Sequence, residues 1–240
     1  MSERKILIVV ANPSVSTTTG WPVGFWASEL IHPYDCLVAA GYRVAIASPN
    51  GGKVELDAYS DPRDASGYSR DDTLSLKYLE DQSFVALLQN TPSVSTVSVK
   101  DFDAIIVAGG QSPMFTFEAA TDLQHLFMDF YNAGKVSAAL CHGTSLLLYL
   151  KNPDGSPFVT GRTITGFANS EEDFVDQTVG QKLMPFRIED EAIRLGARFV
   201  TGPAFQPFAV RDGNLITGQQ QHSGGEVARL VIEALKGGKQ

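Results

Sequence analysis

Short, continuously hydrophobic runs alternate along the chain with longer segments in which apolar residues recur at helical spacing. The hydrophobic runs are predicted strands, and they cover residues 5–10, 42–52, 101–111 and 136–140. The segments with helical spacing are predicted helices, and they cover residues 29–41, 117–135 and 143–150. Strands that are apolar on both faces and separated by helices are typical of a parallel sheet covered on both sides. The pattern therefore predicts a doubly wound α/β fold.

Two polar segments interrupt this alternation. Residues 53–98 are richer in Asp, Ser and Lys and contain a predicted helix at 72–90, so we interpret them as a cap-like insertion in a single domain spanning 1–240. Residues 168–186 are also polar and punctuated by Gly and Pro, and they resemble a second insertion. A helix at 189–199 and a last strand, turn and helix within 214–235 complete the predicted order.

Composition narrows the range of partners and compartments. The net charge is −8 and no basic stretch is interleaved with aromatic residues, so a nucleic-acid partner is not expected. The apolar run at 5–10 ends at Asn12-Pro13 and fits a strand better than a signal peptide. No run approaches the ~18 apolar residues of a membrane span. The only cysteines, Cys36 and Cys141, lie far apart, which argues against a disulfide framework and favours the cytoplasm.

Cys141 stands where the fourth predicted strand gives way to the next helix. In α/β sheets, sites form beyond the carboxyl ends of the strands. Ala139 and Gly143 flank Cys141 at two positions on either side, and such small residues suit a sharp strand-to-helix turn that exposes a nucleophile. A helix start beside the sulfur is expected to lower the thiol pKa. The alternative is an inert, buried cysteine, an interpretation that fits Cys36 well.

Several motifs occur together and in a recognisable order. They are KILIVV, the stretch from Glu29 to Pro33, AGYRVAIASPNGG, DFDAIIVAGG, GKVSAALCHG, TITGF and LITG. In this order the chain resembles the ThiJ/PfpI superfamily of class I glutamine-amidotransferase-like proteins. The insertion after the second strand resembles the branch with the heat-shock chaperone and glutathione-independent glyoxalase III proteins. The resemblance implies a flavodoxin-like sheet, a homodimer, and one of several activities: glyoxalase, deglycase, protease or amidase, isonitrile hydratase or chaperone.

The resemblance also implies roles for Glu29 and His142. Glu29 matches the acid that hydrogen-bonds the nucleophile and exchanges protons with the substrate. His142 matches the histidine that follows the nucleophile, and a sharp turn can bring these neighbours face to face. The alternatives are a solvated glutamate at a helix start and a histidine that merely packs or caps.

The third member of the implied set is an acid after the TGF motif. Glu172, five residues beyond Phe167, matches the family spacing best, and Glu171 and Asp173 are its rivals. Its role would be to orient His142 and stabilise its positive charge, as a triad acid does. An acidic run of this kind is also typical of a solvated helix face.

Gly109 and Gly110 close the third predicted strand, where the family places backbone N–H groups that hold an oxyanion. Glycine permits both a positive φ and the close approach of a ligand. The N–H of His142 would be the other donor. A plain strand-to-loop turn is the alternative interpretation.

One departure from the branch concerns metal binding and the pocket wall. Many members carry His-Gly after the paired glycines, whereas this chain has Gln111-Ser112. The remaining histidines show no metal-ligand spacing; they are His32, His125 and His222. The sequence therefore predicts no required metal and no cofactor.

These features favour a cysteine-dependent enzyme that acts on a small reactive carbonyl compound. The leading hypothesis is a glyoxalase III-like lyase that converts methylglyoxal to lactate in stress or detoxification. The second is an amidase or peptidase with Cys141, His142 and Glu172 as its triad. The third is a non-catalytic chaperone or redox sensor, with exposed apolar surface at residues 22–26 or 114–117.

Overall fold

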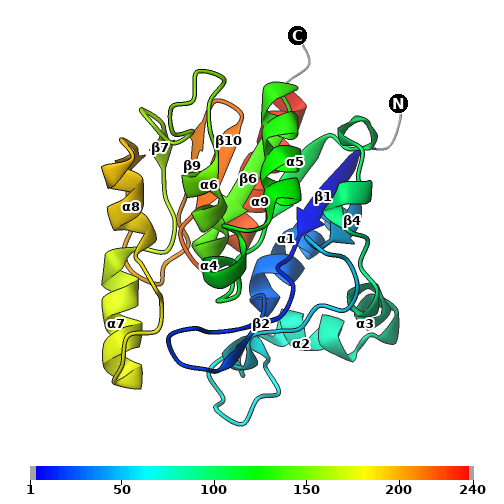
Figure 1. Cartoon of the computed structure of the whole chain (residues 1–240). Coiled ribbons are helices and arrows are strands. Elements are labelled where there is room, and N and C mark those ends of the chain that lie inside the picture. The colour runs from blue at the N-terminus through cyan, green and yellow to red at the C-terminus, as the bar shows by residue number, and fades with distance from the viewer. Residues whose placement is uncertain (1–3, 238–240) are drawn as a thin grey trace.

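A six-stranded sheet forms the centre of the computed structural model, which describes residues 4–237 (Figure 1). Its order is β4-β1-β5-β6-β10-β9, and the strands are β1 Lys5–Val9, β4 Arg43–Ala47, β5 Ala104–Val107, β6 Val136–Leu140, β9 Ala209–Asp212 and β10 Leu215–Gly218. All neighbours are parallel except β9, which is antiparallel to β10. The parallel strands follow the order of flavodoxin-like folds. The predicted α/β class is confirmed.

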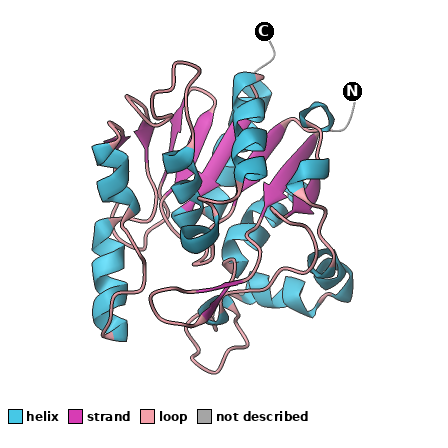
Figure 2. Cartoon of the chain, in the orientation of Figure 1, coloured by secondary structure: helices cyan, strands magenta, loops and turns pink. Residues whose placement is uncertain are grey.

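Helices cover both faces of the sheet (Figure 2). Ile6 and Ile8 of β1 belong to the core shared with α1 Ala27–Ala39 and α9 Gly224–Gly237. Leu7 and Val9 belong to the opposite core, shared with α5 Thr121–Asn132, α6 Leu146–Tyr149 and α8 Ile188–Arg194. Burial of each side chain of this size contributes about 1.5–3 kcal/mol to the stability of the folded state. Alternate side chains of β1 therefore lie on opposite faces of the sheet, and each set packs against its own layer of helices.

Helix α1 begins earlier than the sequence pattern indicates. It starts at Ala27, so Pro33 lies inside the helix and not near its start. Proline has no N–H, so the carbonyl of Glu29 lacks its usual partner four residues on. Pro33 instead faces α9, where a Cβ on Gly224 would lie only 2.9 Å from its Cδ. Close packing of the two helices accounts for a proline at this position.

The segment before α1 forms a small hairpin at the carboxyl edge of the sheet. Its strands are β2 Ser14–Val15 and β3 Pro22–Val23, which pair antiparallel. They are too short to stand out in a hydrophobicity pattern, and the sequence analysis does not predict them. The hairpin returns the chain to the end of β1, so α1 starts beside the site described below.

The 53–98 segment packs on α1 (Figure 1). It contains α2 Thr73–Glu80 and α3 Gln82–Gln89 in place of the single helix predicted at 72–90. Asp81 separates them, because its carboxylate caps α3 by accepting a hydrogen bond from the Ser83 N–H at 2.8 Å. Short 3-10 turns complete the segment and its return to the sheet: η1 Ala58–Ser60, η2 Val94–Thr96 and η3 Val99–Asp101.

The polar stretch at 168–186 is largely helical, which the sequence analysis does not predict. Helix α7 Asn169–Val179 ends at Gly180, whose φ of 79° places it in the left-handed region. The helix has few apolar residues, and both of its buried residues are glutamates, so no apolar run marks it in the sequence. Both glutamates form hydrogen bonds with other segments of the chain.

Three further predictions need correction. The helix expected at 143–150 is a 3-10 turn, η4 Cys141–Ser145, followed by the single turn of α6. The helix expected at 117–135 is shorter, since α5 covers only Thr121–Asn132, and a separate single turn, α4 Pro113–Thr116, precedes it. The helix expected at 189–199 ends at Arg194, and a short strand follows it, β8 Arg198–Phe199, which pairs with β7 Thr163–Ile164. Within residues 4–237, no helix is long and apolar enough to cross a membrane.

Candidate active site

Cys141 follows β6 directly and adopts a backbone conformation that is rare for a residue with a side chain. Its φ is 55°, one of two positive values among the non-glycine residues of the described chain. Such a conformation costs about 1–3 kcal/mol and is held in place by its surroundings. The residue is 3% exposed, and it lines a cavity. This is the geometry of a nucleophile turn.

Glycines allow the turn to lie directly on the loop after β5. A Cβ on Gly143 would stand 2.6 Å from the carbonyl oxygen of Ala108. A Cβ on Gly109 would stand 2.9 Å from the backbone nitrogens of both His142 and Gly143. Neither position has room for a side chain, so the two loops approach through backbone alone.

Glu29 lies in the first turn of α1 and is completely buried. Its Oε2 accepts a hydrogen bond from the Gly109 N–H at 2.7 Å. Its Oε1 is buried without a hydrogen-bond partner among residues 4–237. Burial raises the pKa of Glu29 to about 8, against the opposing influence of the Cys141 thiol and the Gly109 N–H. This carboxyl can therefore hold or release a proton near neutral pH.

The surroundings raise the thiol pKa, in contrast to the lowering that the sequence analysis expects. Burial is the main cause of the raised pKa of Cys141, and the negative charge of Glu29 is the second. The N–H of His142 opposes the shift. The expected helix start is only a short 3-10 turn, so it supplies little of the anticipated dipole. Attack by this sulfur therefore requires a base that takes its proton.

His142 is placed to be that base. Its Nδ1 lies 3.8 Å from the Cys141 Sγ, and its Nε2 lies 2.9 Å from the Glu172 Oε1. Both side chains of the His142–Glu172 pair are almost fully buried. The imidazole packs on the Phe167 ring, with centroids 4.3 Å apart and planes tilted by 31°. A carboxylate and an aromatic ring thus fix the orientation of the imidazole.

Tertiary structure separates Glu172 from its two rivals. Glu171 is buried, but it accepts hydrogen bonds from the N–H groups of Ala168 and Phe205 and from the Gln219 amide. Asp173 is 71% exposed and pairs with Arg187. Of these three acids, only Glu172 contacts the histidine ring through its carboxylate.

Asp57 is a buried acid near the site that the sequence analysis does not find. Its carboxylate accepts hydrogen bonds from the N–H groups of Gly24, at 2.9 Å, and Gln111, at 2.5 Å. Burial raises its pKa to about 6, although these hydrogen bonds and His142 act in the opposite direction. The residue stands in an acidic, polar segment with no motif, so the sequence contains no signal for it. It connects the loops that precede α1 and follow β5.

The two glycines expected to hold an oxyanion differ in what their N–H groups do. Gly109 already donates to Glu29, which removes it from the expected donor set. The Gly110 N–H has no hydrogen-bond acceptor within the described part of the chain. The φ of Gly110 is 105°, a value that requires glycine. Gly110 and His142 are therefore the two expected donors that the geometry leaves for this role.

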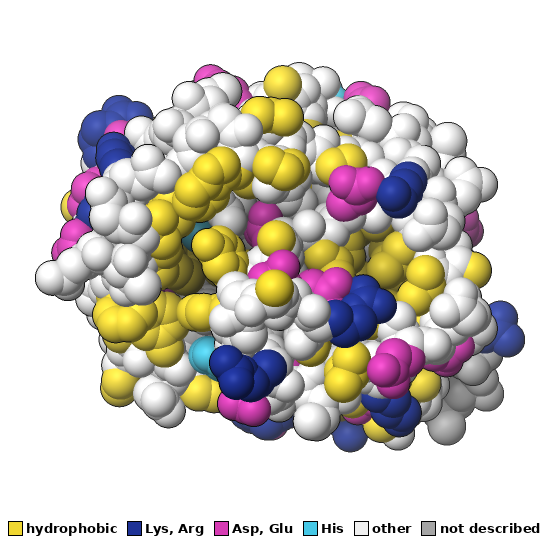
Figure 3. Space-filling view, turned by 90° about the horizontal axis from the view of Figure 1, so that it is seen from below, with side chains coloured by type: hydrophobic (Ala, Val, Ile, Leu, Met, Phe, Trp, Pro, Cys, Tyr) yellow, Lys and Arg dark blue, Asp and Glu magenta, His cyan; other side chains and the backbone are white. Residues whose placement is uncertain are grey.

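A cavity of about 440 Å³ opens beside Cys141 and His142. Tyr59 and Tyr68 of the 53–98 segment line it, as do Trp26 and the side chain of Gln111. The Tyr68 ring meets the Trp26 ring edge-on at 5.9 Å, and its hydroxyl accepts a hydrogen bond from Gln221 at 3.3 Å. Viewed from below, hydrophobic side chains surround a hollow in this face of the molecule (Figure 3).

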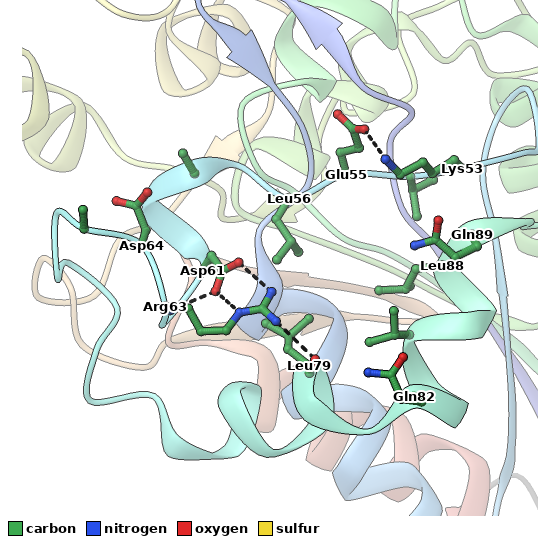
Figure 4. Close-up of a pocket in the computed structure, with 14 residues that line it drawn as sticks. Lys53, Glu55, Leu56, Asp61, Arg63, Asp64, Leu79, Gln82, Leu88 and Gln89 are labelled. Atoms are coloured by element: carbon green, nitrogen blue, oxygen red, sulfur yellow. Dashed lines mark hydrogen bonds and ion pairs between the residues drawn. The ribbon is translucent and has the colours of Figure 1, made fainter.

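A second cavity, of about 670 Å³, lies within the 53–98 segment (Figure 4). Four of its charged groups form two ion pairs, and Asp64 accepts a hydrogen bond from the Ser66 N–H. Arg63 binds Asp61 and the carbonyl of Leu79, and Lys53 binds Glu55. No cysteine or histidine lines it. This larger cavity therefore lacks the cysteine and histidine of the candidate active site.

No group of three or more His, Cys, Asp or Glu side chains in residues 4–237 is arranged to hold a metal ion. His32 instead contacts Asp72 at 2.9 Å, at the start of α2.

Comparison with known proteins places this site in a family. The model of the DJ-1/PfpI family matches residues 22–234, which include the whole of the geometry described above. The chain belongs to the DJ-1/PfpI family. This DJ-1/PfpI protein is 31% identical to the glutathione-independent glyoxalase hsp3101 of Schizosaccharomyces pombe, over 97% of this chain and 96% of the relative.

Solved structures agree with this membership. Rapid Encystment Protein 24 KDa of Francisella tularensis is 28% identical, with a TM-score of 0.86 over 97% of this chain and 99% of that one. Glyoxalase III of Candida albicans is 26% identical, with a TM-score of 0.77 over 96% of this chain and 97% of that one. The family resemblance expected from the motifs is confirmed.

Proposed function

We propose that this DJ-1/PfpI protein is a glutathione-independent glyoxalase that converts a 2-oxoaldehyde and water into a 2-hydroxy acid. The observation that carries the proposal is the arrangement around one sulfur. The Cys141 thiol lies 3.8 Å from the His142 imidazole, and it also lowers the raised pKa of the buried Glu29. The relatives named as glyoxalases support the same activity.

In the first step the sulfur attacks the aldehyde carbon. His142 takes the thiol proton as the S–C bond forms, and Glu172 stabilises the imidazolium. The developing oxyanion would accept hydrogen bonds from the N–H groups of Gly110 and His142, and protonation gives a hemithioacetal. A base is needed because burial raises the pKa of this thiol.

The next steps move a hydrogen from one carbon to its neighbour. The Glu29 carboxylate removes the proton from the former aldehyde carbon, which gives an enediol, and a proton is then delivered to the former ketone carbon. The aldehyde carbon is oxidised to a thioester and the ketone carbon is reduced to an alcohol, so no external electron donor is required. A pKa of about 8 suits Glu29 to both transfers.

Hydrolysis completes the cycle. Water attacks the thioester with His142 as base, the C–S bond breaks, and the sulfur regains its proton. The net change adds one water to the substrate and leaves the protein as it began. Removal of a reactive carbonyl in this way is a detoxification reaction.

The test is lactate production from methylglyoxal in the absence of glutathione. The wild-type protein is expected to form lactate, and Cys141→Ala is expected to form none. Cys36→Ala is the matched control, because this half-buried cysteine on α1 lies outside the site and should leave the rate unchanged. Absence of lactate with the wild type, or equal rates for wild type and Cys141→Ala, would contradict the proposal.

A cysteine hydrolase is the second candidate, because the same Cys141–His142–Glu172 arrangement suits acyl transfer. It predicts a burst of p-nitrophenol from p-nitrophenyl acetate, with an acyl group retained on Cys141. The aromatic side chains of the 53–98 segment line the cavity, which favours a small substrate over a peptide. A burst without lactate formation would favour this candidate over the first.

A further inference from the structure

The cavity beside Cys141 is larger than methylglyoxal requires. Its volume of about 440 Å³ falls in the range of roughly 300–1,000 Å³ that is typical of sites for drug-sized ligands. Methylglyoxal carries only a methyl group beside its two carbonyls. Most of the cavity would therefore remain filled with water after such a substrate had bound.

The additional volume follows one face of α7. Glu172, Val175 and Val179 all line the cavity, and their spacing of three and four residues places them on the same side of the helix. Glu172 binds His142, so it marks the chemical end of the cavity. Val179 lies seven residues further along, about 10 Å away at ~1.5 Å per residue. The cavity therefore extends about two helical turns from the histidine.

The remaining walls of this extension are mostly apolar. They come from the end of α7, the segment after it, the β2–β3 hairpin and the loop around residue 205, and they include Trp21, Phe174, Leu183, Met184 and Phe205. Figure 3 shows the same character at the surface, where hydrophobic side chains gather around the hollow. Burial of apolar surface against such walls is the main source of affinity that they can provide.

Hydrogen bonds hold these walls in position. The Thr18 hydroxyl donates to the carbonyl of Leu183, which fixes the hairpin to the segment after α7. The Leu183 N–H donates to the Asp176 carboxylate at 2.9 Å, which fixes the same segment to the helix. The Phe174 and Phe205 rings meet edge-on at 5.2 Å. The apolar extension is therefore formed before any ligand binds.

Charge narrows the class of ligand further. Among the described residues, no lysine or arginine lines the cavity, and its one carboxylate, Glu172, is engaged with His142. A phosphate or carboxylate on the substrate would lose its hydration without gaining a cationic partner. A neutral hydrocarbon substituent meets no such cost.

We infer that the preferred substrates are 2-oxoaldehydes with an extended aliphatic or aromatic substituent, which lies along Val175 and Val179 while the aldehyde carbon meets Cys141. The inference rests on the proposed glyoxalase function and specifies its substrate class. Each additional buried methylene is expected to raise kcat/KM about four-fold until the extension is filled. Val175 and Val179 are then specificity-determining residues for this reaction.

The test compares kcat/KM for methylglyoxal, phenylglyoxal and hexylglyoxal, without glutathione, by chromatographic measurement of each 2-hydroxy acid. The wild type should favour the two larger substrates about ten-fold or more. Val179→Trp fills the far end of the cavity, so it should lower kcat/KM for the larger substrates about ten-fold. The kcat/KM for methylglyoxal should change less than about three-fold. Gln177→Trp, on the exposed side of the same helix, is the matched control and should change none of them.

The outcomes separate this inference from the function on which it rests. Turnover of methylglyoxal with equal or lower kcat/KM for the larger substrates overturns the inference and leaves the glyoxalase function intact. Equal loss for all substrates in a folded Val179→Trp also overturns it. Turnover of no 2-oxoaldehyde overturns both. The wild-type substrate series decides the matter alone if the variant does not fold.

Discussion

Glu29→Gln should make the protein more resistant to unfolding at alkaline pH while it removes activity. The Glu29 carboxyl is completely buried, and its pKa is raised from 4.5 to about 8 in the folded state. Below pH 4.5 it is protonated in both states. As pH rises, the unfolded state releases its proton first, so the native state loses stability until pH passes about 8.

The magnitude follows from the two pKa values. Each unit corresponds to about 1.36 kcal/mol, so the full shift costs the native state about 5 kcal/mol. About 3.5 kcal/mol of that loss falls between pH 5 and pH 8. Glutamine does not titrate, and its amide oxygen can still accept the Gly109 N–H. The variant should therefore lack this part of the pH dependence.

Urea unfolding at pH 5 and pH 8 measures the effect as a difference in the free energy of unfolding. Comparison across pH cancels any constant cost of placing an amide in the site, and it also cancels the titration of Asp57, which both proteins share. Glu118→Gln, an exposed acid, is the control and should follow the wild type. If Glu29→Gln lost as much stability as the wild type over this range, the buried carboxyl would not be the group that titrates.

Three other changes test separate parts of the site. Glu172→Gln removes the charge that stabilises the imidazolium and should lower kcat about 100-fold or more with little change in KM, measured by steady-state lactate formation. Gly109→Ala places a methyl group 2.7 Å from the Glu29 Oε2 and should cost about 1–3 kcal/mol in urea unfolding, whereas Gly225→Ala, with open space around it, should cost nothing. Asp57→Asn replaces a carboxylate whose pKa is raised from 3.8 to about 6, so the variant should lose less stability than the wild type as pH rises from about 4 to 6, and the loss that remains should be that of Glu29. An unchanged kcat, equal stability of the two glycine variants, or an unaltered pH dependence would contradict these three expectations in turn.

Local pattern in the sequence was sufficient for the five parallel strands of the central sheet and for the turn at Cys141, but not for the antiparallel edge strand β9. Continuous apolar runs predict strands that are buried on both faces, because both layers of a doubly wound fold need hydrophobic contact. Small residues two positions either side of Cys141 indicate a turn at the end of a strand, since only small side chains fit there. These are properties of adjacent residues, and the sequence displays them directly.

Only the tertiary structure decided the protonation of the site and the choice among neighbouring acids. Asp57 accepts hydrogen bonds from the N–H groups of Gly24 and Gln111, which lie in segments distant from it in the sequence. No local sequence pattern indicates these contacts. Glu171 and Glu172 are adjacent, and the orientation of α7 alone determines that Glu172 meets the histidine. The sequence suggested a lowered thiol pKa, but burial beside a second acid raises it. Burial and charge act through space, so they depend on what the folded chain brings together.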